Sequence, residues 1–267
     1  MGGAHGRGQD SRRSPLHAHG LVVHGHSPLH RLEPQCKLAA TVLFILAVVA
    51  TPRESFWAYG CYAVVVVVMA RIAQLPFRLL LRRLAIELPF VAFAFFLPIV
   101  GGGERVDVVG LSLSVAGLWG AWNILVKGTL GVAATVIMAA TTPVPDILHG
   151  LDRLRVPRAF TAIAGFMVRY LDVIAGEMRR MKVARESRGH DPRWIWQARA
   201  VAASAGALFI RSYERGERVH LAMLSRGFGG SMPVLTEQTA SRREWLATLS
   251  VPLLAATVAT IAWVVRP

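Results

Sequence analysis

The apolar stretch Leu38–Thr51, LAATVLFILAVVAT, decides the fold class of this chain. Pro34 can occupy the first position of a helix over this stretch, and Pro52 ends it. At about 1.5 Å per residue, a helix from Pro34 to Thr51 is roughly 27 Å long, which is just enough to cross the hydrocarbon core of a bilayer. The sequence therefore predicts a membrane-spanning helix here.

Four further runs have the same apolar character. Prolines 89 and 98 within them would break a soluble helix but are tolerated in membrane bundles, and closely spaced glycines and alanines before residue 142 favour tight helix packing. We therefore expect an all-α integral membrane protein with about five transmembrane helices, four within residues 34–142 and one within 245–267. The four further runs are Phe56–Ala70, Leu84–Val100, Leu118–Thr142 and Trp245–Val265.

The composition of the whole chain agrees with this class. Its 267 residues are 54% hydrophobic and only 17% charged, with a mean hydropathy of +0.44 and a formal net charge of +14. A soluble domain carries about 25% charged residues, so an ordinary cytosolic enzyme is excluded. A disordered nucleic-acid-binding tail is excluded because such segments are poor in apolar residues. Two cysteines, Cys36 and Cys61, are too few for a disulfide-rich fold or a cysteine-cluster metal site.

The distribution of charge predicts the orientation in the membrane. The loop between the second and third runs carries Arg71, Arg78, Arg82 and Arg83 and no acid, whereas the next connection is nearly neutral. Arginine-rich loops lie on the cytoplasmic side. We therefore expect a multi-pass protein of the cell membrane, with its amino terminus and residues 143–244 in the cytoplasm. The positive-inside bias also accounts for most of the net charge.

The segment 143–244 holds most of the charged residues and predicts a second architecture. Apolar residues recur at spacings of three and four, which indicates two long amphipathic helices, from about Pro157 to Arg188 and from Arg193 to about Arg226. Acidic residues on the first of them, Asp172 and Glu177, are expected to pair with arginines of the same helix.

Both long helices end in nearly the same sequence, at an offset of 38 residues. The first ends Ala184-Arg185-Glu186-Ser187-Arg188-Gly189-His190, and the second ends Ala222-Met223-Leu224-Ser225-Arg226-Gly227-Phe228. A single Ser-Arg-Gly is an ordinary helix stop, because glycine adopts the left-handed cap and arginine favours the negative end of the helix dipole. Its repetition favours a docking role. Each end would project a guanidinium toward carboxylates or carbonyls, and two such ends fit the two related sockets of a dimeric ATPase.

These motifs carry a family resemblance. Together with Arg153–Pro157, Phe166–Tyr170 and Arg211–Arg218, they make residues 24–233 resemble the transmembrane T component of energy-coupling factor (ECF) transporters, specifically the cobalt type called CbiQ. The resemblance implies a non-catalytic subunit of an ATP-driven ABC-type importer that supplies cobalt for cobalamin biosynthesis. It implies two ABC-type ATPase partners, which bind the ATP, and a metal-binding membrane partner of the S or M type. The coupling role falls on Ala184, Arg188, Gly189, Ala222, Arg226 and Gly227.

The polar tail over residues 1–33 is rich in histidine and is expected to be flexible. Imidazole binds nickel, cobalt and zinc, so His24 and His26 are candidate metal ligands. A basic tail without ordered metal is the favoured interpretation, because the resemblance assigns metal selection to the partner. We expect no bound cofactor on this chain.

Two charges within the apolar runs, Glu87 and Lys127, are functional candidates by default. The predicted topology places them at different depths, so a direct pair is not expected. Snorkelling, or burial against a partner subunit, is the milder interpretation of each.

Three alternatives to a cobalt importer remain open from the residues. The first is the same role in a nickel or vitamin importer. The second is a lipid-modifying membrane enzyme, although no phosphate-binding loop, zinc-protease motif or serine elbow is visible. The third is a binder of nucleic acid or anionic lipid driven by net charge; we expect a lipid bilayer around the chain and no nucleic acid partner.

Overall fold

The computed structural model describes residues 27–102, 104–108, 111–189, 198–229 and 240–265. The chain divides into two compact units. The first, here called the bundle unit, contains residues 18–154 and 237–267. The second, here called the helix-pair unit, contains residues 155–236.

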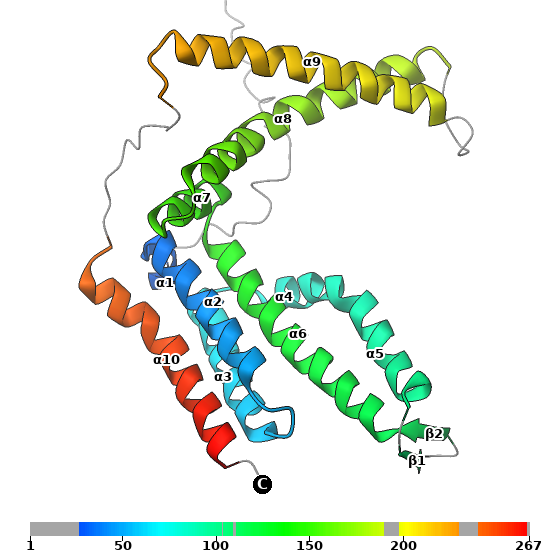
Figure 1. Cartoon of the computed structure of the whole chain (residues 1–267), viewed down its shortest axis with the longest axis vertical. Helices are drawn as coiled ribbons and strands as arrows, with labels where there is room; N and C mark the ends of the chain where they lie inside the picture. Colours follow the sequence, from blue (N-terminus) through cyan, green and yellow to red (C-terminus); the bar gives the residue numbers. More distant parts are fainter. Residues whose placement is uncertain (1–26, 103, 109–110, 190–197, 230–239, 266–267) are drawn as a thin grey trace, which may run out of the picture. The chain divides into compact units, whose positions relative to one another are not determined.

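The bundle unit is almost entirely helical, as predicted, and each of the five apolar runs forms a helix (Figure 1). Pro34 is the first residue of its helix, and Ser241 caps the last one in a capping box with Glu244. The elements are α1 (Pro28–Arg31), α2 (Pro34–Ala50), α3 (Phe56–Ile72), α4 (Phe77–Leu84), the short 3₁₀ helix η1 (Ala85–Glu87), α5 (Leu88–Val100), β1 (Arg105–Val108), β2 (Leu111–Ser114), α6 (Val115–Thr141), α7 (Val144–Arg153) and α10 (Arg242–Val264).

Several of these helices are long and apolar enough to cross a membrane. Within the described residues of the bundle unit they are Arg78–Val100, Val115–Thr141 and Arg242–Val264, while α2 and α3 are shorter apolar helices of 17 residues. The protein is therefore a multi-pass membrane protein. In the helix-pair unit, Arg158–Glu186 also meets the criteria of length and composition.

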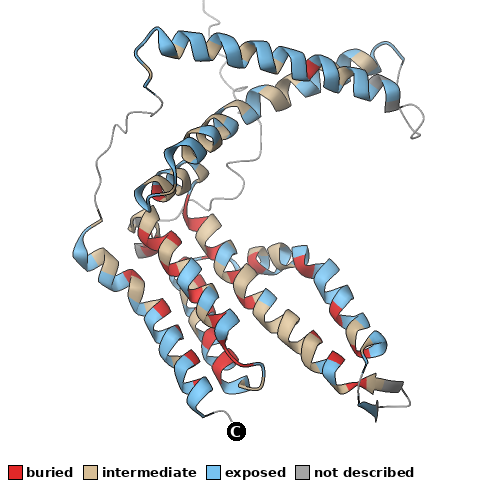
Figure 2. Cartoon of the chain, in the orientation of Figure 1, coloured by how far each residue is buried: buried red, intermediate tan, exposed pale blue. Residues whose placement is uncertain are grey.

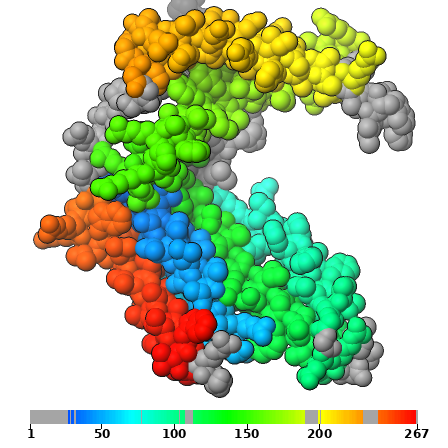
Figure 3. Space-filling model, in the orientation of Figure 1, coloured from blue at the N-terminus to red at the C-terminus, as the bar shows by residue number. Residues whose placement is uncertain are grey.

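The core of the bundle unit lies where α2 packs between α10, α6 and α3 (Figures 1 and 3). Tyr62 of α3 is fully buried there, and its hydroxyl lies 2.8 Å from Oγ1 of Thr51 and 3.1 Å from the carbonyl oxygen of Ala255 in α10. A buried hydroxyl needs such partners. These contacts fix three helices against one another at the end of the bundle remote from α7.

The stretch before the third run differs from the prediction. We expected an arginine-rich loop, but Phe77–Leu84 forms α4, with Leu80 buried and Arg78 and Arg82 exposed. The leucines recur at helical spacing, so the segment can bury one face while its arginines stay in water. The chain also forms a two-stranded antiparallel hairpin, β1–β2, after Gly101 and Gly102, in the nearly neutral connection between the third and fourth runs.

The expected difference in depth between Glu87 and Lys127 is wrong. Glu87 is buried, and its Oε2 accepts a hydrogen bond of 3.0 Å from the Thr129 hydroxyl, on the same part of α6 that carries Lys127. Lys127 instead donates 2.7 Å to the carbonyl oxygen of Val49. The two charges therefore lie close along α6 but face different neighbours, and they form no ion pair within the described part of the chain.

Candidate functional site at two helix ends

The helix-pair unit consists of α8 (Arg158–Glu186) and α9 (Ala198–Leu224), and both end in the same way. Gly189 and Gly227 have φ angles of +77° and +81°, the left-handed conformation that L side chains rarely adopt. The last three amides of each end, up to the glycine, make hydrogen bonds that match at the 38-residue offset. For example, the Gly189 N–H donates to the carbonyl oxygen of Glu186, and the Gly227 N–H donates to that of Leu224. The repeated sequence thus specifies a repeated helix cap.

The second end is described one residue further. The amide of Phe228 donates to the carbonyl oxygen of Met223 at 3.0 Å, which closes the six-residue loop of a Schellman cap. The corresponding residue of the first end, His190, lies outside the described residues, as do the metal candidates His24 and His26. The described residues contain no group of three or more histidine, cysteine or acidic side chains able to hold a metal ion.

Within the described part of this unit, the motif arginines lack the side-chain partners that several other basic residues have. Arg188 and Arg226 are exposed, and neither guanidinium has a hydrogen-bond or ion-pair partner among the described residues. Neighbouring charges do pair: Arg218 lies 3.9 Å from Glu214, and Lys182 lies 3.6 Å from Glu186. Within the described part of the chain, each motif arginine therefore keeps its guanidinium donors available for a ligand.

The motif alanines leave room beside these arginines. Ala184 and Ala222 are exposed, one turn before Arg188 and Arg226 on the same helix face. A methyl group there allows another backbone to approach closely. The six predicted site residues thus fall into two groups of three, one at each helix end, and every one of them is exposed.

An ion-pair bridge holds the two helices in place. Glu177 of α8 accepts from Arg211 at 3.2 Å and from Arg215 at 3.3 Å, both on α9, and its side chain is only 15% exposed. The prediction that Glu177 pairs with arginines of its own helix is wrong. A carboxylate facing a second helix can accept from two guanidinium groups at once, which an i,i+4 pair does not offer.

The crossing of α8 and α9 is antiparallel and otherwise sparsely packed. Arg185 donates to Ser204 at 3.3 Å, so later residues of α8 meet earlier residues of α9. No residue of α8 is buried, and Leu208 is the buried hydrophobic residue of α9 among those described (Figure 2). The crossing therefore buries little apolar surface beside its polar bridge.

The crossing sets the distance between the two helix ends. The first end lies one turn beyond Arg185, which contacts Ser204, whereas the second end is 22 residues further along α9. At about 1.5 Å per residue, Ser204 is roughly 33 Å from the second end, and the first end lies about one turn on the other side of Ser204. Figure 1 shows the two ends at opposite ends of α9. The site is therefore two separate contact points rather than one cleft.

The family comparison covers the sequence of both helix ends. The family described as CbiQ, cobalt transport protein, matches residues 25–237 and so includes both helix ends. The chain belongs to the CbiQ family. The match leaves out most of the histidine-rich tail and α10.

Individual relatives of this CbiQ-family chain bear names of the same kind. A putative fused cobalt transport protein CbiMQ of Methanocorpusculum labreanum is 27% identical over 79% of the chain, which spans 37% of that longer protein. The cobalt transport protein CbiQ of Rhodobacter capsulatus is 31% identical over 49% of this chain and 54% of its own length. The energy-coupling factor transporter transmembrane protein EcfT of Listeria innocua is 22% identical over 79% of this chain and 84% of its own.

Proposed function

We propose that this CbiQ-family chain is the transmembrane coupling subunit of an ATP-driven ECF-type importer for cobalt. In this role it binds two ABC-type ATPase subunits through its two helix ends and transmits their movement to a metal-binding membrane subunit. ATP is bound and hydrolysed by the partner chains, and cobalt is the transported ion. This chain contributes no catalytic residue and no cofactor.

The single observation that carries the proposal is the pair of exposed arginines on equivalent helix caps, neither of which has a partner among the residues that the structure describes. An exposed guanidinium with five free donors suits a carboxylate or a set of carbonyls on a docked protein. The caps match in φ and in hydrogen bonds, so the same socket can accept either. Two identical sockets belong to a symmetric pair of subunits.

The charge of α8 supports a cytoplasmic position for this helix despite its length. Six of the ten residues in 177–186 are charged, and Glu177 pairs with arginines of α9. Placing these charges at membrane depth costs several kcal/mol. We therefore place the helix-pair unit and the amino terminus in the cytoplasm, where the ATPases are. The five apolar helical stretches of the bundle unit then cross the membrane.

The substrate class follows the names of the relatives. Two of them are named as cobalt transport proteins, whereas the EcfT relative bears no substrate in its name. Nickel or a vitamin in place of cobalt would leave the role of the helix ends unchanged. A lipid-modifying enzyme has no supporting arrangement of side chains within the described residues.

The test replaces both motif arginines in one protein. Arg188→Ala with Arg226→Ala should abolish copurification of the ATPases and cobalt uptake, because each socket loses its charged contact. The matched control is Arg180→Ala with Arg218→Ala, which removes two charges at the same 38-residue offset, one at a position where the arginine already pairs with Glu214.

The amount of each variant in the membrane is measured alongside, so that a folding defect is recognised. The control should assemble and transport as the parent protein does. Unchanged assembly and uptake in the motif variant would refute the coupling role. An equal loss in both variants would show that net charge, rather than the caps, binds the ATPases.

A further inference from the structure

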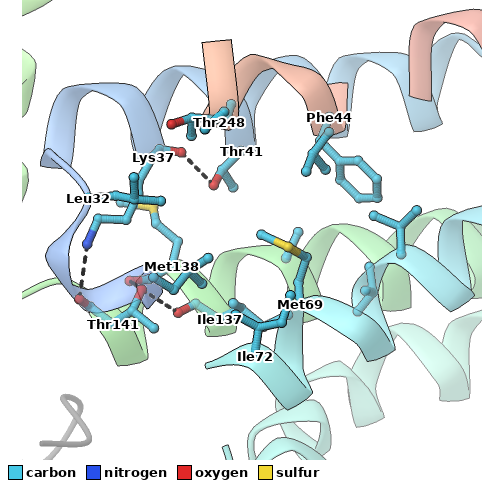
Figure 4. Close-up of a pocket in the computed structure, with 17 residues that line it drawn as sticks. Leu32, Lys37, Thr41, Phe44, Met69, Ile72, Ile137, Met138, Thr141 and Thr248 are labelled. Atoms are coloured by element: carbon cyan, nitrogen blue, oxygen red, sulfur yellow. Dashed lines mark hydrogen bonds between the residues drawn. The ribbon is translucent and has the colours of Figure 1, made fainter. Parts of the chain in front are cut away.

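A cavity of about 410 Å³ lies within the bundle unit, between α2, α3, α6 and α10 (Figure 4). This volume is within the roughly 300–1,000 Å³ range of ligand pockets. Thirteen of its seventeen lining residues are apolar, including Phe44, Met69 and Met138, and methionine side chains adapt readily to a flexible ligand. The cavity therefore suits a hydrocarbon chain.

The threonine hydroxyl groups that line this cavity already donate their hydrogens to backbone carbonyl groups. Thr41 donates 2.8 Å to the carbonyl oxygen of Lys37, and Thr141 donates 3.0 Å to that of Ile137. Thr248 likewise donates to the carbonyl oxygen of Glu244. None of the three threonines has a hydrogen left for a ligand in these contacts, so they do not mark a sugar or peptide site.

Lys37 is the exception among the polar lining residues. It is only 7% exposed, and its ammonium donates one hydrogen bond, of 3.2 Å, to the carbonyl oxygen of Thr141. Glu33 and Asp146 act on it electrostatically, but neither forms an ion pair with it among the described residues. An ammonium has three donors, so two remain for a ligand with a negative charge.

The Lys37 ammonium lies at one end of the apolar cavity. Figure 4 shows Lys37 at one end of the cavity and Phe44 toward the other, seven residues or about 10 Å along α2. Two exposed arginines, Arg242 and Arg243, begin α10 one turn before Ala247 and Thr248 of the cavity lining. A ligand with an anionic head and an apolar tail matches this order of groups.

We propose that the cavity binds an anionic membrane phospholipid, with its phosphate on Lys37 and one acyl chain among the apolar lining residues. The membrane supplies such a lipid, and the cationic end of the cavity lies at the helix ends that the charge distribution assigns to the cytoplasmic face, whose leaflet carries anionic lipids. The inference is independent of the proposed coupling function, since no residue of the helix-pair unit takes part.

The test measures lipid retained by the purified full-length chain. Palmitoyl-oleoyl phosphatidylglycerol and the phosphatidylcholine with the same chains are titrated onto the detergent-solubilised protein, and bound lipid is counted by native mass spectrometry. The parent protein should retain the anionic lipid preferentially. Lys37→Met should reduce this affinity by about tenfold to a hundredfold, the range expected for a lost hydrogen bond to a charged group.

Lys127→Met is the matched control. Lys127 is also a lysine of a membrane helix that donates to a backbone carbonyl, but it does not line the cavity. It should retain the preference for phosphatidylglycerol. A preference that survives in the Lys37 variant, or disappears equally in the control, would overturn the proposal.

A second variant keeps Lys37 and removes the space. Ala134→Phe places a ring in the cavity lining on α6 and should expel the acyl chain of either lipid. Retention of phosphatidylglycerol by this variant would overturn the proposal even if Lys37→Met failed to fold. Displacement of the lipid by an equal concentration of inorganic phosphate would also overturn it, because the site would then select a free anion.

Discussion

The same substitution, glycine to alanine, should have opposite effects on stability at two positions of α9. Gly227 ends α9 at a φ of +81°, and no atom lies within 4 Å of the position that a Cβ would take. Gly227→Ala therefore meets no steric contact, and its whole effect is the cost of the left-handed conformation, about 1–2 kcal/mol. Gly206, also on α9, likewise has nothing within 4 Å but lies inside the helix. Gly206→Ala should stabilise the helix by about 0.5–1 kcal/mol.

Hydrogen exchange of the full-length protein measures both effects. A loss of 1–2 kcal/mol corresponds to roughly fivefold to thirtyfold faster exchange of the cap amides, of which Gly227 and Phe228 donate at 3.0 Å to Leu224 and Met223. Gly206→Ala should slow exchange in the same segment or leave it unchanged. Gly227→Asn should lose less than Gly227→Ala, because asparagine tolerates the left-handed region.

The refuting result is specific to this reasoning. Equal exchange in the parent and Gly227→Ala would show that the positive φ stores no preference for glycine. Equal loss in the alanine and asparagine variants would show that the side chain itself, rather than the backbone angle, disturbs the end. Either result would refute the explanation that glycine is repeated at the two helix ends because the backbone there has a positive φ.

Two further predictions concern helix packing. A Cβ on Gly117 of α6 would lie 2.3 Å from the carbonyl oxygen of Leu97 on α5. Gly117→Ala should therefore lower the free energy of unfolding of the bundle unit, measured in detergent, by about 1–3 kcal/mol. Gly131→Ala on the same helix should not lower it, because a Cβ there would meet open space. Glu177→Gln should weaken the crossing of α8 and α9, and the distribution of distances between spin labels at Ser187 and Ser225 should become broader. Glu214→Gln is the control and should leave this distribution unchanged, because Glu214 forms only an exposed ion pair of 3.9 Å with Arg218.

The membrane helices could be predicted from sequence because hydropathy over about twenty residues is a local property. The stretch Phe77–Leu84 was mistaken for a loop because arginine density outweighed the spacing of its leucines. That error moved the depth of Glu87: the helical stretch begins at Phe77, so Glu87 lies ten residues into it instead of three. The hydrogen bond from Thr129, near the middle of α6, therefore places Glu87 deeper along the bundle than the predicted run did.

The site shows the same division between local and non-local information. The caps at Gly189 and Gly227 could be predicted because a helix stop is specified by a few adjacent residues. The bridge from Glu177 to Arg211 and Arg215 could not, because spacing along one helix gives no information about a second helix. Lys37 falls within the predicted helix from Pro34 to Thr51, but only the packing shows that its side chain is buried.

The separation of the two docking points follows from this non-local part of the structure. The motifs specify what each helix end is, but the distance between them depends on where α8 meets α9 and on the length of α9 beyond that contact. The Arg185–Ser204 hydrogen bond and the Glu177 bridge fix the first quantity, and the 22 residues from Ser204 to Arg226 fix the second. Under the proposed coupling role, movement of two ATPase sockets toward or away from each other would act on the crossing, where little apolar surface is buried and charged hydrogen bonds can rearrange at small cost. In this proposed role, we expect such a movement to rotate one helix against the other at this sparsely packed crossing.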